Sequence, residues 1–125
     1  MIVIVKSDGT LAGPMAQAQA ESYLNNVHAN PGLTANLKQA MNDLTGGKGK
    51  ASQPYVFNGQ PILHASSGNE QKSITLFFYR TGGNEYVVAM GEHAGKVKGK
   101  ETYKLTHYGQ DANQTFKRGA TITLS

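Results

Sequence analysis

The chain of 125 residues contains no cysteine, few charged residues and no long apolar run. The missing cysteine excludes disulfide bonds, thiolate zinc sites and a cysteine nucleophile. The first apolar run, residues 1 to 5, is too short for the core of a signal peptide or for a membrane span. We therefore expect a cytoplasmic protein without membrane association, with delivery to another cell as the alternative destination.

What the chain does contain suits a small globule with many loops. Hydrophobic residues make up 38% and charged residues 16%, and 15 glycines are spread along the sequence. This composition is unlike that of a disordered charged tail or a coiled coil. The length fits a single domain over residues 1–125 and leaves no room for a separate cofactor-binding half, so no cofactor is expected.

The hydrophobic pattern changes from helical to strand-like along the chain. Residues 1–6 are β-branched and apolar, which predicts a buried strand. A first helix is expected to begin at Gly13 and Pro14, and a second over 33–44 with Gly46 as its cap. Strands are predicted over 55–58, 62–65, 73–80, 85–92, 102–108 and 116–124. The fold class is thus α+β, with an N-terminal strand and two helices packed on one face of a mainly antiparallel sheet of four to six strands.

The pair of strands over 73–80 and 85–92 should form a hairpin around a four-residue loop at 81–84. The expected register puts two apolar pairs on the side under the helices, Phe78 with Val87 and Leu76 with Ala89. The other side is mixed in character and should carry three pairs, Tyr79 with Tyr86, Phe77 with Val88 and Thr75 with Met90. That mixed side either receives a ligand or is ordinary core beneath the C-terminal strands.

The whole positive excess lies near the C-terminus. The net charge is +4, and residues 93–118 alone hold six basic and two acidic side chains. The same stretch carries His93, His107, Tyr103 and Tyr108. Cations mixed with aromatic groups suit RNA or DNA, which offer both phosphates and flat bases. The alternative is that these lysines form a solvated loop that binds nothing acidic.

Several kinds of site are poorly supported. The loop at 46–50 is basic and glycine-rich but lacks the spacing of a phosphate-binding loop, so it is interpreted as a linker. The four histidines show no metal-ligand spacing, and no metal site is expected. A Ser-His-Asp hydrolase lacks its Gly-x-Ser-x-Gly turn.

Metal-independent RNA cleavage needs less: a base for the ribose 2′-hydroxyl, an acid for the departing 5′-oxygen, and cations near the phosphate. The candidate catalytic residues are His93, His64 and His107, of which strand pairing could bring at least two together. Proton transfer would use His93 with either His64 or His107. A single histidine is more commonly a surface or hydrogen-bonded residue, and the helix dipole suffices to explain His28. The candidate substrate-binding residues are Lys72, Arg80, Lys96, Lys98, Tyr103, Lys104 and Tyr108.

The stretches 72–80 and 85–93, Lys-Ser-Ile-Thr-Leu-Phe-Phe-Tyr-Arg and Glu-Tyr-Val-Val-Ala-Met-Gly-Glu-His, resemble the central hairpin of RelE-like toxins. The order strand, helix, helix, sheet is similar as well. The resemblance implies membership of the wider barnase, colicin and RelE-like group of metal-independent ribonucleases, which are often neutralised by an acidic antitoxin. By position, Lys72 resembles the basic residue that opens the first hairpin strand, His93 the polar end of the second, and Lys96 a basic residue that follows.

This chain continues through two further predicted strands, and Lys72 stands where many members have arginine. If those strands supply the site, His107, Tyr103 and Lys104 are the better candidates. The leading hypothesis is a toxin-like metal-independent endoribonuclease that acts on RNA by general acid and base catalysis, with an acidic antitoxin or immunity protein as a partner. The alternative is a non-enzymatic module that binds protein or nucleic acid, such as an immunity or accessory protein.

Overall fold

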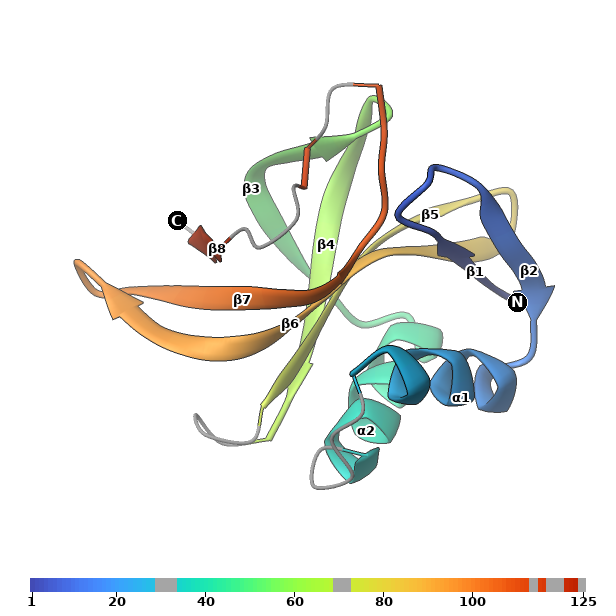
Figure 1. The fold of residues 1–125 in the computed structure, drawn as a ribbon, viewed down its shortest axis with the longest axis horizontal. Helices are drawn as coiled ribbons and strands as arrows, with labels where there is room; N and C mark the ends of the chain where they lie inside the picture. The colour runs from blue at the N-terminus through green and yellow to red at the C-terminus, as the bar shows by residue number, and fades with distance from the viewer. Residues whose placement is uncertain (29–33, 69–72, 113–114, 117–120, 124–125) are drawn as a thin grey trace.

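The computed structural model describes residues 1–28, 34–68, 73–112, 115–116 and 121–123, and this part of the chain holds two helices and eight strands. In chain order the elements are β1 (Ile2–Val5), β2 (Leu11–Met15), α1 (Gln17–His28), α2 (Thr34–Thr45), β3 (Lys50–Phe57), β4 (Gln60–Ser67), β5 (Ile74–Thr81), β6 (Asn84–Val97), β7 (Lys100–Tyr108) and β8 (Thr121–Thr123). The class is α+β as predicted, and α1 and α2 lie together on one side of the sheet (Figure 1). The expected four to six strands were too few.

The sheet forks at its longest strand. Six strands follow the order β2-β1-β6-β5-β4-β3, while β7 pairs with β6 and β8 pairs with β7. β6 pairs with β1 over its first residues and with β7 from Ala89 onward, and the β6–β7 hairpin reaches away from the helices (Figure 1). The β1–β6 pair is parallel, whereas the other described pairs are antiparallel, so the sheet is mixed.

Apolar side chains are buried on both faces of the sheet. One cluster joins the helices to the sheet through residues such as Leu24, Leu37 and Phe78. The second cluster lies on the opposite face and includes Phe77 and Phe116. Most of the mixed side of the hairpin is therefore ordinary core under the C-terminal strands and does not receive a ligand. The exception is the end of the hairpin at the first residues of β5.

The predicted hairpin is present, but its register is only partly as expected. Tyr79 pairs with Tyr86, and their rings stack at 4.9 Å between centroids. Phe78 also pairs with Val87 as predicted. A bulge between Phe77 and Phe78 then shifts the pairing by one residue. The three expected pairs beyond it are wrong: Phe77 lies opposite Ala89, Leu76 opposite Met90 and Thr75 opposite Gly91.

The hairpin loop is also shorter than predicted. Thr81 pairs with Asn84, which leaves Gly82 and Gly83 as a two-residue turn. Their φ angles are 58° and 81°. A two-residue type I′ turn, whose twist matches that of the flanking strands, requires two consecutive positive φ angles. Glycine adopts such angles without steric cost.

The N-terminal helix begins later than predicted. Gly13 and Pro14 lie in β2, and α1 starts at Gln17. β2 is an edge strand, where proline is tolerated because its missing N–H removes no bond to an inner neighbour. The second helix is where it was expected, but Gly47, with φ of 85°, forms the left-handed cap in place of Gly46. None of the helices in the described ranges has the length and apolar character that crossing a membrane would need.

Candidate functional site

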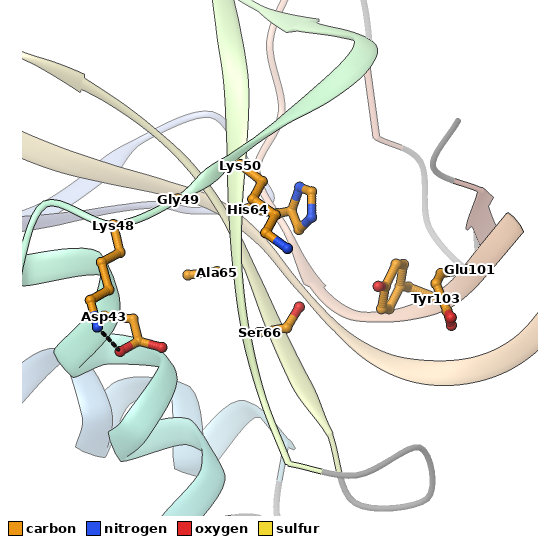
Figure 2. A pocket seen from close by; sticks show the side chains of 9 residues that line it. All are labelled: Asp43, Lys48, Gly49, Lys50, His64, Ala65, Ser66, Glu101 and Tyr103. Carbon is orange, nitrogen blue, oxygen red and sulfur yellow. Dashed lines mark ion pairs between the residues drawn. The ribbon is translucent and has the colours of Figure 1, made fainter.

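Two adjoining hollows open between the C-terminal end of α2, β4 and β7. The larger, of about 430 Å³, is lined by Asp43, Lys48, Gly49, Lys50, His64, Ala65, Ser66, Glu101 and Tyr103 (Figure 2). The smaller, of about 180 Å³, is lined by Ser66, Gly68, Ser73, Thr75, His93, Glu101 and Tyr103. Because three residues border both hollows, we treat the two as one groove.

The strand pairing explains why a groove exists here. The described pairs between β3 and β4 begin at Lys50 opposite His64, so β3 does not cover the edge of β4 beyond that point. Ala65 and Ser66 face the larger hollow at this edge. In Figure 2 the end of α2 borders the hollow on one side and β7 borders it on the other, with the His64 ring and the Tyr103 hydroxyl turned toward the space between them.

His64 is held by a buried serine. Its Nδ1 lies 2.7 Å from the Oγ of Ser52, whose residue is only 1% exposed. Burial lowers the pKa of His64 below 6.5, and the positive charge of Lys50 on the paired strand lowers it further. The imidazole is therefore neutral at neutral pH. The contact to Ser52 is compatible with either tautomer of the ring. In the tautomer with its proton on Nδ1, the ring donates to Ser52 and Nε2 keeps a lone pair that can accept a proton.

Tyr103 joins the two hollows. It is 6% exposed, and its hydroxyl is hydrogen-bonded to Thr75 and Ser66, whose own hydroxyl oxygens lie 2.6 Å apart. Burial raises the pKa of Tyr103 above 10.0. The phenol thus keeps its proton at neutral pH and can donate a hydrogen bond to an anion in the groove.

His93 lies on the other side of Tyr103. The two residues are paired across β6 and β7, and their rings meet edge to face at 6.1 Å between centroids. Nε2 of His93 is bonded to the carboxylate of Glu101, which fixes the orientation of the ring. The structure therefore brings two of the three predicted catalytic histidines, His64 and His93, to one groove.

His107 does not line this groove. It is 6% exposed, its Nε2–H donates to the backbone carbonyl of Val5 at 2.9 Å, and its ring lies edge to face with Tyr23. Burial lowers the pKa of His107, although the carbonyl of Val5 opposes that effect. A buried imidazole with a backbone partner is explained by packing and hydrogen bonding alone.

The predicted substrate-binding residues are scattered. Tyr103 lines the groove, but Arg80 hydrogen-bonds to backbone carbonyls of the α2 region and Tyr108 packs beside the second core cluster. Lys98 is exposed in the β6–β7 turn, and Lys104 is exposed on β7 outside the lining of either hollow. Lys72 and the side chain of Lys96 lie outside the described residues.

Sequence reasoning missed the cations and hydroxyls that do line the groove. Lys48 and Lys50 belong to the loop that was interpreted as a linker. Ser66, Thr75 and Glu101 carried no recognisable motif. Ser66 and Thr75 are paired across the neighbouring strands β4 and β5, but Glu101 on β7 joins them only in the folded sheet. The one available signal was the Gly-Lys-Gly-Lys run itself, which has the composition of an anion site without its usual spacing.

Within the described ranges, no three histidine, aspartate or glutamate side chains gather as a metal site would require. A scan of protein-family models, a search of curated proteins and a search of solved structures all found no match to this chain. The resemblance to RelE-like toxins accordingly stays a prediction.

Proposed function

We propose that the groove cleaves RNA without a metal ion, as a toxin-like endoribonuclease. One observation carries the proposal: His64 and His93, which are distant in sequence, line adjoining hollows that share Tyr103. Cleavage of RNA through its own 2′-hydroxyl needs a base and an acid on opposite sides of one phosphate. Two imidazoles that border adjoining hollows, with Tyr103 shared between the hollows, can supply that pair.

His64 is assigned as the base. Its lowered pKa keeps the ring neutral, so Nε2 can accept the proton of a ribose 2′-hydroxyl. The 2′-oxygen then forms a bond to the neighbouring phosphorus, and the bond from phosphorus to the 5′-oxygen of the next nucleotide breaks. His93, whose Nε2–H stays bonded to Glu101, gives the proton on its Nδ1 to that departing oxygen. The products are a 2′,3′-cyclic phosphate and a 5′-hydroxyl, and no oxidant, reductant or metal is consumed.

The remaining groove residues match the charge that develops on the phosphate. The Tyr103 hydroxyl and the ammonium groups of Lys48 and Lys50 can donate hydrogen bonds to the equatorial oxygens. Glu101 accepts a hydrogen bond from His93 and would remain its ion-pair partner when the ring is protonated. Lys48 and Lys50 would also offer ion-pair partners to an acidic antitoxin or immunity protein, although Asp43 and Glu101 balance their charge within the lining.

The test is incubation of the purified protein with a single-stranded RNA in the presence of a metal chelator. We expect fragments ending in a 2′,3′-cyclic phosphate, while DNA of the same sequence is bound but left intact. RNA that stays intact between about pH 6 and 8 would contradict the proposal. In that event, salt-sensitive binding would indicate nucleic-acid binding alone, and salt-insensitive binding to a protein would indicate the non-enzymatic module.

A further inference from the structure

We infer that Arg80 is a positioning residue that clamps the lysine-bearing loop, residues 46–50, against the sheet and so sets where Lys48 and Lys50 lie in the groove. Its Nη2 donates to the backbone carbonyl of Leu44 at 2.9 Å and to that of Lys48 at 2.7 Å. One guanidinium thus bridges the last turn of α2 and the loop that follows. The effect on the loop is independent of the reaction, and only its consequence for RNA rests on the proposed function.

The clamp has a second side, formed by Phe78. The guanidinium carbon of Arg80 lies 4.8 Å from the centre of the Phe78 ring. Gly49 lies against the same ring, since a Cβ built on it would stand 2.8 Å from Cζ of Phe78. With φ of 153°, Gly49 is also in a backbone conformation that favours glycine. Arg80 and Gly49 therefore fix the loop on the buried ring of Phe78, which belongs to the core beneath the helices.

The end of α2 leads the chain into this clamp. The amide of Gly47 donates to the carbonyl of Leu44, and the amide of Lys48 donates to that of Asp43 at 2.9 Å. These two bonds form the left-handed glycine cap of a helix. The chain then reaches Lys50, which pairs with His64 as β3 begins. A shift of the loop would consequently move both lysines relative to His64.

The ligand chemistry that follows is a phosphate group held between the two lysines and the Tyr103 hydroxyl. The charged groups that line the hollow with His64 are Asp43 in the last turn of α2, Lys48 in the loop that follows, Lys50 on β3, and Glu101 on β7. Lys48 and Asp43 are 3.9 Å apart and the lysine side chain is 76% exposed, so this ion pair holds the lysine only weakly.

The experiment compares the folded wild type with Arg80→Lys, Arg80→Met and Gly49→Ala, using NMR titration of the histidine rings and the affinity for inorganic phosphate. Arg80→Lys keeps the charge, but the shorter side chain ends in an ammonium group and loses the planar guanidinium that lies over Phe78 while its Nη2 donates to both carbonyls. Gly49→Ala displaces the loop with Arg80 intact, which covers the case in which an Arg80 variant does not fold. Lys38→Gln, an exposed lysine of α2 outside the groove, is the matched control.

In all three clamp variants we expect the pKa of His64 to rise toward its ordinary value, because Lys50 moves away, while the pKa of His107 stays unchanged. Phosphate affinity should fall about tenfold, the factor typical of one charge-assisted hydrogen bond. Lys38→Gln should change neither quantity. A folded Arg80→Met protein with unchanged His64 pKa and phosphate affinity would overturn the inference, as would an Arg80→Lys protein that behaves like wild type. If these effects appear but the wild type cleaves no RNA, the inference stands and the proposed function fails.

Discussion

Three histidine side chains of the described chain sit in three different hydrogen-bonding environments. His64 is bonded to the hydroxyl of Ser52, His93 to the carboxylate of Glu101, and His107 to the backbone carbonyl of Val5. The first two line the groove, whereas the third is sealed among packed side chains. The sequence identifies the histidines as candidates. Their burial and their hydrogen-bond partners distinguish the two groove histidines from His107, and residues elsewhere along the chain determine both properties.

The two histidines with lowered pKa values should make the protein less stable in acid. For His64 and His107 the folded pKa lies below the ordinary 6.5. As pH falls through 6.5, the unfolded chain takes up protons that the folded chain does not, so the free energy of unfolding decreases. We expect urea unfolding to show this decrease between neutral pH and about pH 5, and the decrease should be smaller in His107→Gln. A free energy of unfolding that is constant or rises over this range would contradict the assignment.

Asp111 ties two distant segments together. Its carboxylate accepts hydrogen bonds from the backbone amides of Asn58 and Thr115 and from the Thr115 hydroxyl, at 2.8 to 3.0 Å. Burial alone would raise the pKa of Asp111, but these hydrogen bonds outweigh it and hold the pKa below 3.8.

Asp111→Asn should therefore lower the free energy of unfolding at neutral pH by about 2 kcal/mol, because an amide cannot accept all three bonds. The difference from wild type should shrink as pH falls below 3.8 toward the folded pKa, where the native carboxylate is protonated as well. Urea unfolding at several pH values measures both effects. Equal stability of the two proteins at neutral pH would show that these hydrogen bonds contribute nothing.

At the scale of elements, the segment after β7 passes very close to β1. A Cβ built on Gly109 would stand 2.7 Å from Cγ1 and 2.8 Å from the carbonyl oxygen of Val5. We expect Gly109→Ala to destabilise the protein by about 2 kcal/mol or more, because backbone and a β-branched side chain must both move. Gly47→Ala is a useful comparison, since open space surrounds that position and only the left-handed backbone is strained, at a cost of about 1 kcal/mol.

Thermal and urea unfolding of the two glycine variants would measure the difference. If Gly109→Ala is no more destabilising than Gly47→Ala, the segment after β7 does not pack as closely against Val5 of β1 as the structure shows. Gly109→Ala should leave the groove intact, because Gly109 does not line it, whereas Gly47→Ala strains the cap that leads into the lysine-bearing loop.

The elements that were predicted well are those specified locally. The second helix and the hairpin over β5 and β6 follow from periodicity and from the Gly82–Gly83 turn. No local sequence pattern predicts the bulge at Phe77. The bulge places Leu76 opposite Met90, so that both side chains lie in the core beneath the helices, and this packing is a tertiary effect. The Gly13-Pro14 pair is typical of helix starts and predicts one here, but pairing with β1 makes this segment the strand β2.

At the scale of the whole molecule, the groove is a product of the forked sheet. β1 pairs with the first residues of β6, and β7 pairs with the rest of β6 from Ala89 onward. β7 therefore places Tyr103 and Glu101 at the hollow that also borders the uncovered edge of β4. The strands from β3 to β7 each pair with the next strand along the chain, but the site depends on how the folded sheet brings β7 beside β4, and no local pattern specifies that contact. The sequence therefore predicts which types of residue form the site better than it predicts which individual residues line it.

The two lysines of the groove should make RNA binding depend on salt. Each lysine that contacts a phosphate of a single strand contributes about 0.7 to the slope of log affinity against log salt concentration. Replacing Lys48 and Lys50 together by glutamine should therefore reduce that slope by about 1.4. The Lys98→Gln variant, altered at the exposed hairpin turn, should leave cleavage of a short substrate unchanged. Binding by the double variant with the wild-type slope would place the RNA elsewhere on the molecule.

The most direct test is the rate of RNA cleavage by three single variants, His64→Gln, His93→Gln and His107→Gln, measured as kcat/KM at neutral pH on one substrate. If the groove is the site, the first two substitutions should each lower kcat/KM by about 100-fold or more, the usual contribution of a general acid or base. His107→Gln should stay within a few-fold of wild type, because glutamine can still donate to Val5 and the residue lies outside the groove. Cleavage that survives the loss of His64 and His93 but not that of His107 would contradict the account.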